Sequence, residues 1–451
     1  MNFFIFSTLL YLFKSNNKKV VIDFDTELNT NISIENFMQS FFYNKIFTYL
    51  SIGTPFQKIP VSIKFRNYPF YIIDSSSKFL PSKNQTFYNK NISSTFKQYN
   101  SNFSGLYEED IIFAYLSEDD IKINDKYFFK KMKFNLASEF KNNSIYFSGC
   151  IGLNLFSNDY FFVQSHFITQ LKQNSFIKSY DFTINYLDDN KGKIIIGLRP
   201  DEYDNNYNEN DIKYININYI EFSDFYYVIF SNILMNVYNI ENYVNIYFQI
   251  EFNFILGSYK FYNYIQSNFF NKFIENKICF LKQFIINYNN KEKKYDYFLC
   301  NDDINLKEFG NLIFYIKEIN FNFTLNENDL FINYKNKKFF LIVFEKGSNE
   351  WILGKPFFKK YQLVFNQDKK IIYFYNKKRK QNHLKIKIFH IIFFLLLLIL
   401  ICLLFYIIIF KFKKQKRIKV KELEENLNYL NFDDNKLIKK SNKIEMSNNN
   451  K

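Results

Sequence analysis

Short apolar runs, separated by clusters of Asn, Asp and Lys, fill most of residues 45 to 375. The runs are rich in Ile, Val, Tyr and Phe, and this length and composition are typical of β-strands. The clearest of them are residues 49–53, 58–65, 111–116, 182–187, 193–197, 225–230 and 370–376. Helical spacing of apolar residues is scarce, and residues 261–274 are the best helix candidate. The pattern therefore predicts a large, mostly β globular part.

A much longer apolar run lies near the C-terminus. Residues 388–410 form a stretch of 23 residues in which His390 is the polar exception. A helix needs about 20 apolar residues to cross the core of a bilayer, whereas a buried core helix of this length normally contains more polar residues. We therefore predict a transmembrane helix at residues 388–410 and a basic cytosolic tail at residues 411–451.

The chain begins with another apolar stretch, residues 1–13, which is followed by polar Ser15, Asn16 and Asn17. This pattern is typical of a signal peptide, predicted here at residues 1–16. The stretch lacks a basic start and a clear small-residue cleavage pair, so an uncleaved anchor is the alternative. Residues 17–44 are predicted to be a linker or pro-segment. With the later span, these segments predict a single-pass type I protein of the secretory pathway or cell surface, its ectodomain lumenal or extracellular.

The net charge of +15 would fit a nucleic-acid-binding protein, but the charge is concentrated beside the predicted span. Residues 376–451 contain 18 Lys or Arg against 6 Asp or Glu, so the first 375 residues are nearly neutral. Basic residues that flank a span are attracted to anionic lipid headgroups. Membrane lipid is therefore the expected partner, and no nucleic-acid partner is expected. Because both flanks are basic, charge alone orients the span weakly.

The cysteines and glycosylation sequons fit the same compartment. Cys402 lies in the span, Cys150 stands alone, and Cys279 and Cys300 are 21 positions apart. An oxidising lumen would permit a Cys279–Cys300 disulfide worth about 3 kcal/mol, and two free thiols are the alternative. Asn-X-Ser/Thr sequons, the acceptors for N-glycosylation, occur at Asn31, Asn84, Asn91, Asn102, Asn142 and Asn322, all before the span.

Ten glycines in 451 residues are about a third of ordinary usage. Each one that remains therefore marks a place where a side chain is poorly tolerated. Gly53 lies in the segment Tyr-Leu-Ser-Ile-Gly-Thr-Pro-Phe-Gln of residues 49–57, and Gly354 lies in Trp-Ile-Leu-Gly-Lys-Pro-Phe-Phe of residues 351–358. These segments resemble the pepsin-like aspartic protease family, in which an Ile-Gly-Thr-Pro-Pro-Gln turn opens the first lobe and a Trp-Ile-Leu-Gly-Asp segment lies near the end of the second.

Other segments resemble the same family and follow in its order. They are residues 91–96, 149–153, 191–197, 225–228 and 300–325. The resemblance covers about residues 45 to 376 and implies a bilobal pepsin-like β fold, with an N-terminal lobe at residues 45–185 and a C-terminal lobe at residues 186–376. It also implies that Cys300 has an upstream cysteine partner.

The resemblance implies a catalytic centre of two Asp-Thr-Gly motifs, one per lobe. The two carboxylates share one proton and activate a water molecule that attacks the peptide carbonyl. Counting from Gln57 at the family's spacing places Lys64 at the first Asp, Phe65 at the Thr and Arg66 at the Gly. Asp74, in Asp-Ser-Ser-Ser, is an alternative that requires an insertion of about ten residues before it.

The second motif is also altered, because no aspartate occurs between Asp224 and Asp296. Gln249 or Glu251 takes the Asp position, depending on a gap of two residues. We favour Glu251, because Ile-Lys-Phe at residues 63–65 and Ile-Glu-Phe at residues 250–252 then echo each other. A lysine facing a glutamate would pair with it and would not share a proton.

The resemblance also implies a flap hairpin over the site. Residues 97–104 are too few for the family's longer hairpin, and Tyr99 is the nearest candidate for the flap tyrosine. No other catalytic motif is present, since His383 and His390 lie near or within the span, which leaves His166 as a structural residue. Metal-ligand spacings and phosphate-binding loops are absent, so no metal or cofactor is expected.

These features predict a membrane-anchored homologue of aspartic proteases that is catalytically inactive, with a cleft between the lobes that binds a peptide or protein. One alternative is an active aspartic-type endopeptidase with a rearranged site that uses Asp74 or Glu251. The other alternative is a surface scaffold without enzymatic activity.

Overall fold

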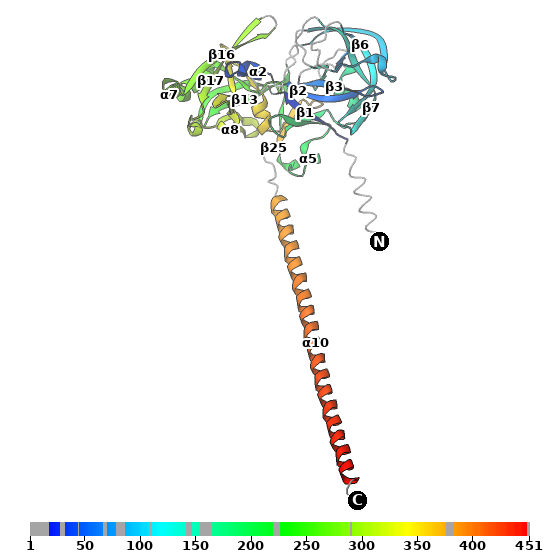
Figure 1. Cartoon of the computed structure of the whole chain (residues 1–451). Coiled ribbons are helices and arrows are strands. Elements are labelled where there is room, and N and C mark those ends of the chain that lie inside the picture. Colours follow the sequence, from blue (N-terminus) through cyan, green and yellow to red (C-terminus); the bar gives the residue numbers. More distant parts are fainter. Residues whose placement is uncertain are drawn as a thin grey trace. The chain divides into compact units, whose positions relative to one another are not determined.

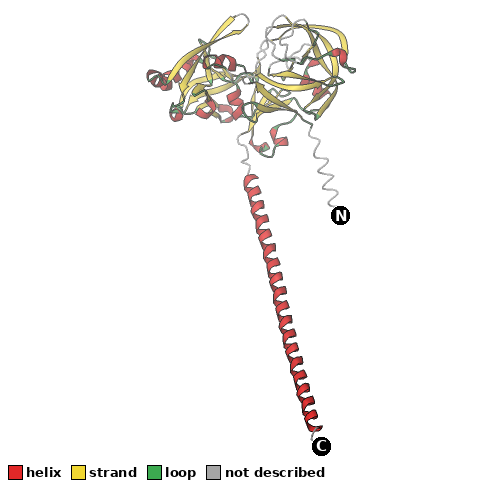
Figure 2. Ribbon diagram, in the orientation of Figure 1, coloured by secondary structure: helices red, strands yellow, loops and turns green. Residues whose placement is uncertain are grey.

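The predicted strands assemble into two large, mostly antiparallel β-sheets in a computed structural model of the chain (Figures 1 and 2). The structure describes residues 18–27, 32–43, 45–65, 70–77, 86–107, 110–140, 147–153, 164–219, 226–288, 291–375 and 383–448. Two compact units are present, Met1–Arg379 with both sheets and Lys380–Lys451 with a long helix. The mostly β class predicted from the sequence is confirmed.

The first sheet combines the N-terminal strands with strands from the middle and the end of the globular unit. Its members are β1 (Val20–Glu27), β2 (Lys45–Ile52), β3 (Gln57–Lys64), β4 (Tyr71–Ile73), β5 (Lys97–Tyr107), β6 (Asp110–Ile123), β7 (Tyr127–Phe140), β8 (Gly149–Gly152), β9 (Asp181–Tyr186), β10 (Lys191–Ile196), β11 (Ile212–Asn216), β24 (Val364–Asn366) and β25 (Ile371–Tyr375). Their order is β11-β25-β24-β9-β10-β1-β2-β3-β8-β4-β7-β6-β5, and β2 also pairs with β6.

The second sheet is built from residues 218 to 353. Its members are β12 (Asn218–Tyr219), β13 (Tyr226–Met235), β14 (Tyr238–Phe248), β15 (Ile255–Gly257), β16 (Cys279–Tyr288), β17 (Lys291–Asn301), β18 (Leu312–Ile316), β19 (Phe321–Leu325), β20 (Phe331–Tyr334), β21 (Lys337–Phe340), β22 (Ile342–Glu345) and β23 (Trp351–Leu353). The order is β19-β18-β13-β14-β23-β15-β22-β17-β21-β20, with β12 beside β13 and β16 beside β17.

Helices are short within the globular unit. They are α2 (Ile34–Phe41), α4 (Phe167–Gln173), α5 (Pro200–Tyr203), α6 (Tyr259–Ile265), α7 (Asn271–Glu275), α8 (Glu327–Leu330) and α9 (Lys355–Lys360), with 3₁₀ turns η1 (Lys90–Ile92), η2 (Glu209–Asp211), η4 (Leu306–Glu308) and η5 (Lys317–Ile319). A π-helical turn, η3 (Gln266–Phe270), joins α6 to α7 end to end. The helix predicted at residues 261–274 is therefore confirmed.

Residues 17–44 were expected to be a linker or pro-segment, but the described part of this region is built into the fold. β1 lies between β10 and β2 and is antiparallel to both. Val20, Ile22 and Phe24 are buried, because their alternate spacing points all three to one face of the sheet. The linker interpretation is therefore wrong for β1, whose period-two pattern is a strand signal.

The same region supplies α2, which packs on the second sheet. Its N-cap Ser33 accepts a hydrogen bond from Asn36 N at 3.3 Å. Phe37 and Phe41 stack with their ring centroids 4.9 Å apart, since residues four positions apart share one helix face. Both rings belong to a buried cluster with residues of β15, β16, β17 and β21.

The two sheets divide the chain differently from the lobe boundary expected at residue 185. That position falls inside β9, which pairs with β10 on one side and β24 on the other. β24 and β25, which lie near the end of the segment expected to form the C-terminal lobe, therefore belong to the first sheet. The physical reason is the antiparallel pairing of Val364 with Thr183 and of Phe365 with Phe182.

The second unit consists of α10 (His383–Asn448), a continuous helix of 66 residues (Figure 1). Within it, Ile392–Glu424 contains a window with a mean hydropathy of 3.5, none of it buried against protein. Such a helix is long and apolar enough to cross a membrane. One candidate span is therefore present among the described residues, where the sequence predicted it.

Candidate functional site

Lys64 ends β3 at the centre of the first sheet. β3 pairs in parallel with β8, and Lys64 lies opposite Gly152 in this register. The amide of Leu153 then donates to Lys64 O at 2.9 Å. β8 can lie between β3 and β4 because it begins with glycine, since a Cβ on Gly149 would stand 2.6 Å from Tyr71 O.

The equivalent position in the second sheet is found from the pairing of β14 with β23. These strands are also parallel, with Phe248 opposite Leu353, and Gln249 N donates to Leu353 O at 3.0 Å. The residues that follow the two strands, Gln249 and Gly354, therefore lie opposite each other, as Lys64 lies opposite Gly152. Of the two alternatives for the second Asp position, the register favours Gln249, whereas the sequence pattern favoured Glu251.

Glu251 instead forms a direct contact between the loops that follow β3 and β14. Its side chain is buried, and Oε1 accepts a hydrogen bond from Phe65 N at 2.6 Å. Phe65 is the residue after Lys64, so the two loops meet at this point. A carboxylate that accepts from a backbone amide stabilises the negative charge and satisfies a buried donor. Glu251 thus joins the two loops across 186 positions of sequence.

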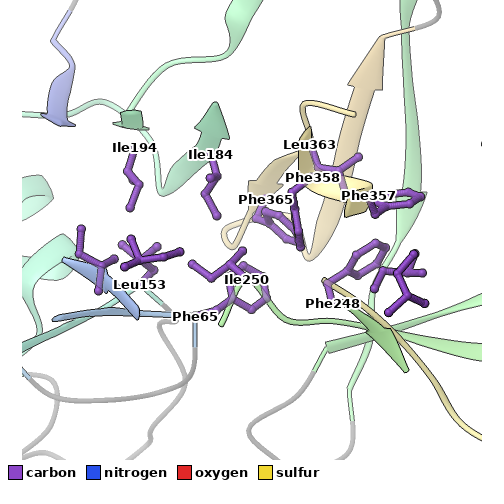
Figure 3. Packing of buried hydrophobic residues seen from close by; sticks show 14 of the residues in the cluster. Phe65, Leu153, Ile184, Ile194, Phe248, Ile250, Phe357, Phe358, Leu363 and Phe365 are labelled. Carbon is purple, nitrogen blue, oxygen red and sulfur yellow. The ribbon is translucent and has the colours of Figure 1, made fainter. Parts of the chain in front are cut away.

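Apolar packing surrounds this contact (Figure 3). Phe65 is 3% exposed and Ile250 is fully buried. The Phe65 ring meets Phe365 edge to face at 4.7 Å and Phe182 at 5.7 Å. These residues belong to one buried cluster that also contains Phe248. Around the Glu251 contact, the two sheets are therefore also joined by buried apolar side chains.

The loop after β14 is held by the segment that follows α2. Asn253 Nδ2 donates to Phe41 O at 2.9 Å, and Asn253 N donates to Phe42 O at 3.3 Å. On the other side, a Cβ on Gly354 would stand 2.1 Å from Phe254 O and 2.6 Å from Phe252 O. Sequence reasoning missed the role of residues 41–43, because polar contacts between distant segments leave no periodic signal.

Two buried amide oxygens beside this loop have no hydrogen-bond partner in the part of the chain that the structure describes. They are Gln249 Oε1 and Asn253 Oδ1. Gln249 and Asn253 are each only 2% exposed. Unmet acceptors of this kind carry a desolvation penalty of about 1–3 kcal/mol each.

The side chain of Asp74, the alternative catalytic residue, makes contacts that stabilise the local structure. Its carboxylate forms an ion pair with Lys90, with Nζ 3.3 Å from Oδ2, and Oδ1 accepts from Ser76 N at 3.2 Å. The backbone of Asp74 bridges to Tyr88. The backbone amide of Asp74 donates to Ala137 O at 3.0 Å, so these contacts tie Asp74 to its own loop and to β7, and none of them is to the loop after β14.

Asp119 is a second buried acid near Tyr88 and also has separate partners. It accepts hydrogen bonds from the hydroxyls of Tyr88 and Thr95, both at 2.5 Å, and of Ser93 at 2.8 Å. Burial, followed by the hydrogen bond to Asp119 and its charge, raises the pKa of Tyr88. Asp74 and Asp119 therefore do not form a pair of carboxylates around one proton.

The hairpin that was expected to be too short is present. β5 and β6 pair from Lys97 opposite Glu118 to Tyr107 opposite Asp110. Tyr99 lies near the base of this hairpin, where its hydroxyl donates to Glu118 Oε2 at 2.7 Å. Burial and this hydrogen bond raise the pKa of Tyr99 to about 12. The position of Tyr99 does not favour its assignment as the flap tyrosine, because β5 continues beyond it to Tyr107.

The disulfide predicted between Cys279 and Cys300 is confirmed and joins opposite residues of β16 and β17. Cys150 is a buried free cysteine, and Cys402 lies exposed on α10. Among the sequons, Asn91 and Asn322 are exposed, and Asn102 lies in β5. Asn31, Asn84 and Asn142, like the predicted signal peptide, lie outside the described residues.

His166 is the N-cap of α4, where its Nδ1 accepts from Thr169 N at 3.3 Å. This is a structural role of the kind that the sequence suggested. Within the described ranges, no group of three or more His, Cys, Asp or Glu residues is placed to hold a metal ion.

Lys355 begins α9, directly after Gly354, and is 5% exposed. Its Nζ donates to Asp189 O at 2.6 Å. Burial lowers the pKa of Lys355 to about 8, although the charge of Asp189 acts in the opposite direction. The folded protein therefore binds fewer protons than the unfolded chain between the folded pKa and the ordinary lysine pKa, and its stability rises with pH in that window.

We expect the free energy of unfolding to rise by about 2 kcal/mol from roughly pH 7.5 to roughly pH 9.5 through this one group. Urea denaturation of the ectodomain at several pH values measures the effect. The matched variant is Lys355→Met, which should have a flatter profile than the wild type, whereas exposed Lys346→Met should leave the profile unchanged. Parallel profiles for wild type and Lys355→Met would contradict the assignment.

Comparison with known families gives one match. The family model described as eukaryotic aspartyl protease matches residues 45–376, which is most of the chain. No curated protein matches the chain.

Proposed function

Because the chain belongs to the eukaryotic aspartyl protease family over residues 45–376, we propose that it is a member without proteolytic activity that acts as a membrane-anchored binding protein. The chain therefore has the family's bilobal pepsin-like fold, one candidate membrane span and a disulfide. The proposal concerns what this fold does without the usual pair of aspartates.

The first support is the chemistry of the residues at the two motif positions. Catalysis in this family needs two carboxylates that share one proton and hold a water molecule. Lys64 offers an ammonium group, which donates hydrogen bonds and accepts none, and the Gln249 amide does not titrate. Neither residue can accept a proton from water at acidic pH, so this pair cannot act as a general base.

The observation that carries the proposal is the position of Glu251. Glu251 is the carboxylate of the second motif, and its Oε1 already accepts a hydrogen bond from Phe65 N at 2.6 Å. The Phe65 ring and Ile250 are buried under this contact. A carboxylate that holds two loops together is not positioned to hold and activate a water molecule with a second carboxylate.

A peptide or protein ligand is the remaining part of the proposal. The family binds extended peptides between its lobes, and the loss of the aspartates removes the chemistry without removing the surrounding strands. The buried oxygens of Gln249 and Asn253 are acceptors that a ligand or water could satisfy. A candidate span would hold such a binding protein at a membrane surface.

We expect the purified ectodomain to show no cleavage of a denatured protein between roughly pH 3 and 6, the range in which paired carboxylates of this family titrate. A transition-state inhibitor of aspartic proteases should change nothing. Product formation is measured by mass spectrometry against an active aspartic protease as control. Turnover that is inhibited and is abolished by Asp74→Asn or Glu251→Gln would overturn the proposal and favour a rearranged active site.

Binding is tested separately with an immobilised peptide analogue of the transition state. We expect the wild-type ectodomain to be retained, and a variant that fills the site, Gln249→Trp, to be retained less. Lys126→Met, in an exposed turn of the first sheet, is the matched control. If the immobilised peptide does not retain the wild-type ectodomain, and neither variant differs from the wild type, the surface scaffold is favoured.

A further inference from the structure

Beyond the apolar run of residues 388–410, α10 continues in a unit in which no other helix or strand is described. The helix continues without a break from the apolar run to Asn448. Every residue from Ile392 to Glu424 is exposed. Isolated helices are marginal in water, and most helical stability in proteins comes from packing an apolar face. A long helix that leaves the membrane therefore needs a partner for that face.

The sequence of this segment contains an apolar seam with alternating steps of three and four residues. The a positions are Val420, Leu427, Asp434 and Ser441, and the d positions are Leu423, Leu430, Leu437 and Ile444. All four d positions are Leu or Ile, and the first two a positions are Val and Leu. A repeat of seven residues places these positions along one side of a helix and specifies a left-handed coiled coil.

We propose that residues 420–444 of α10 form a parallel, in-register coiled coil with a second copy of this chain. The candidate span fixes the orientation, because copies inserted in the same membrane leave it in the same direction and at the same level. This inference rests on α10 as a membrane anchor and is independent of whether the globular unit is catalytic.

Charge complementarity identifies the second copy as the partner. In a parallel dimer, a residue at position g of one helix faces the residue at position e of the partner, five positions further along. Lys419 at g then faces Glu424 at e, and Lys440 at g faces Glu445 at e. Both of the fully charged pairs in this register are attractive. Of the two intervening g–e pairs, Asn426 with Asn431 is neutral, and Asp433 with Ile438 has one charged member.

The two polar a positions, Asp434 and Ser441, lower the stability of the proposed coil. In the in-register dimer the two Asp434 carboxylates lie face to face, and like charges at this distance repel each other. We therefore expect Asp434→Leu to increase the dimer fraction of the full-length protein, measured by sedimentation in detergent micelles.

Disulfide crosslinking of the full-length protein in membranes tests the geometry. The background carries Cys402→Ser, since Cys402 is exposed on α10. Single cysteines at two d positions, Leu423→Cys and Leu430→Cys, should form the oxidised dimer about tenfold faster than cysteines at two f positions, Glu425→Cys and Phe432→Cys, because d residues lie at the interface. Equal rates at d and f positions would overturn the proposal.

Charge reversal tests the register by a second route. Lys419→Glu and Glu424→Lys should each reduce the dimer about twofold to fivefold, as expected for two exposed pairs per dimer. The double variant should restore the wild-type level. Further loss in the double variant would overturn the in-register alignment. Neither experiment measures proteolysis, so their failure would leave the proposed lack of activity unaffected.

Discussion

Replacing Phe65 with alanine is expected to lower the free energy of unfolding of the globular unit by about 3–5 kcal/mol. Phe65 is 3% exposed and its ring packs on Phe182, Phe358 and Phe365. Removing it deletes an aromatic ring and leaves a cavity between segments more than one hundred positions apart. Urea denaturation of the ectodomain, followed by tryptophan fluorescence from Trp351, measures the change.

The matched control is Phe56→Ala. Phe56 lies in the same part of the chain but is 47% exposed, and exposed substitutions usually change stability by less than about 0.5 kcal/mol. Phe65→Thr, which restores the residue type of the family motif, should also destabilise, because the surrounding residues have become apolar. A loss below about 1 kcal/mol for Phe65→Ala would mean that this residue does not join the two sheets.

Removing the disulfide by the double change Cys279→Ala and Cys300→Ala is expected to cost about 3 kcal/mol. The bond closes a loop with a sequence separation of 21. Without it the unfolded chain gains conformational freedom, while the β16–β17 hairpin keeps its hydrogen bonds. Thermal unfolding of the ectodomain measures the difference, and treatment of the wild type with a reductant should reproduce most of it.

Cys150→Ala is the control for the loss of a buried sulfur without the loss of a cross-link. Cys150 is 2% exposed and is not in a disulfide. We expect this variant to be destabilised by less than the double variant. If the reductant has no effect on the wild type, the bond does not contribute to stability under these conditions.

Sequence patterns predicted the parts of the fold that depend on local alternation of apolar and polar residues. The strands around residues 58–65 and 193–197 were located because each has a buried face. The candidate span was found from its length alone. The Cys279–Cys300 pair was predicted because the two cysteines are 21 positions apart in the ectodomain and the family resemblance implied an upstream partner for Cys300.

The site was predicted less well, because its geometry depends on contacts between distant segments. The sequence echo around Lys64 and Glu251 favoured Glu251 for the second Asp position, whereas the sheet register favours Gln249. Glu251 was expected to face Lys64, and no pattern in the sequence indicated that its Oε1 accepts a hydrogen bond from the amide of Phe65. The hairpin of β5 and β6 was expected to be too short because only residues 97–104 were counted for it, whereas Gly105 lies within β5 opposite Ile112.

The position of β24 and β25 in the first sheet has a consequence for folding during synthesis. β9 begins at Asp181, but its neighbour β24 begins only at Val364. At ordinary rates of elongation, roughly 10 to 40 seconds pass between the two. During that time β9 has an open edge that could pair with another chain. Nascent chains of this protein should therefore depend on chaperones until the last strands before α10 have been made.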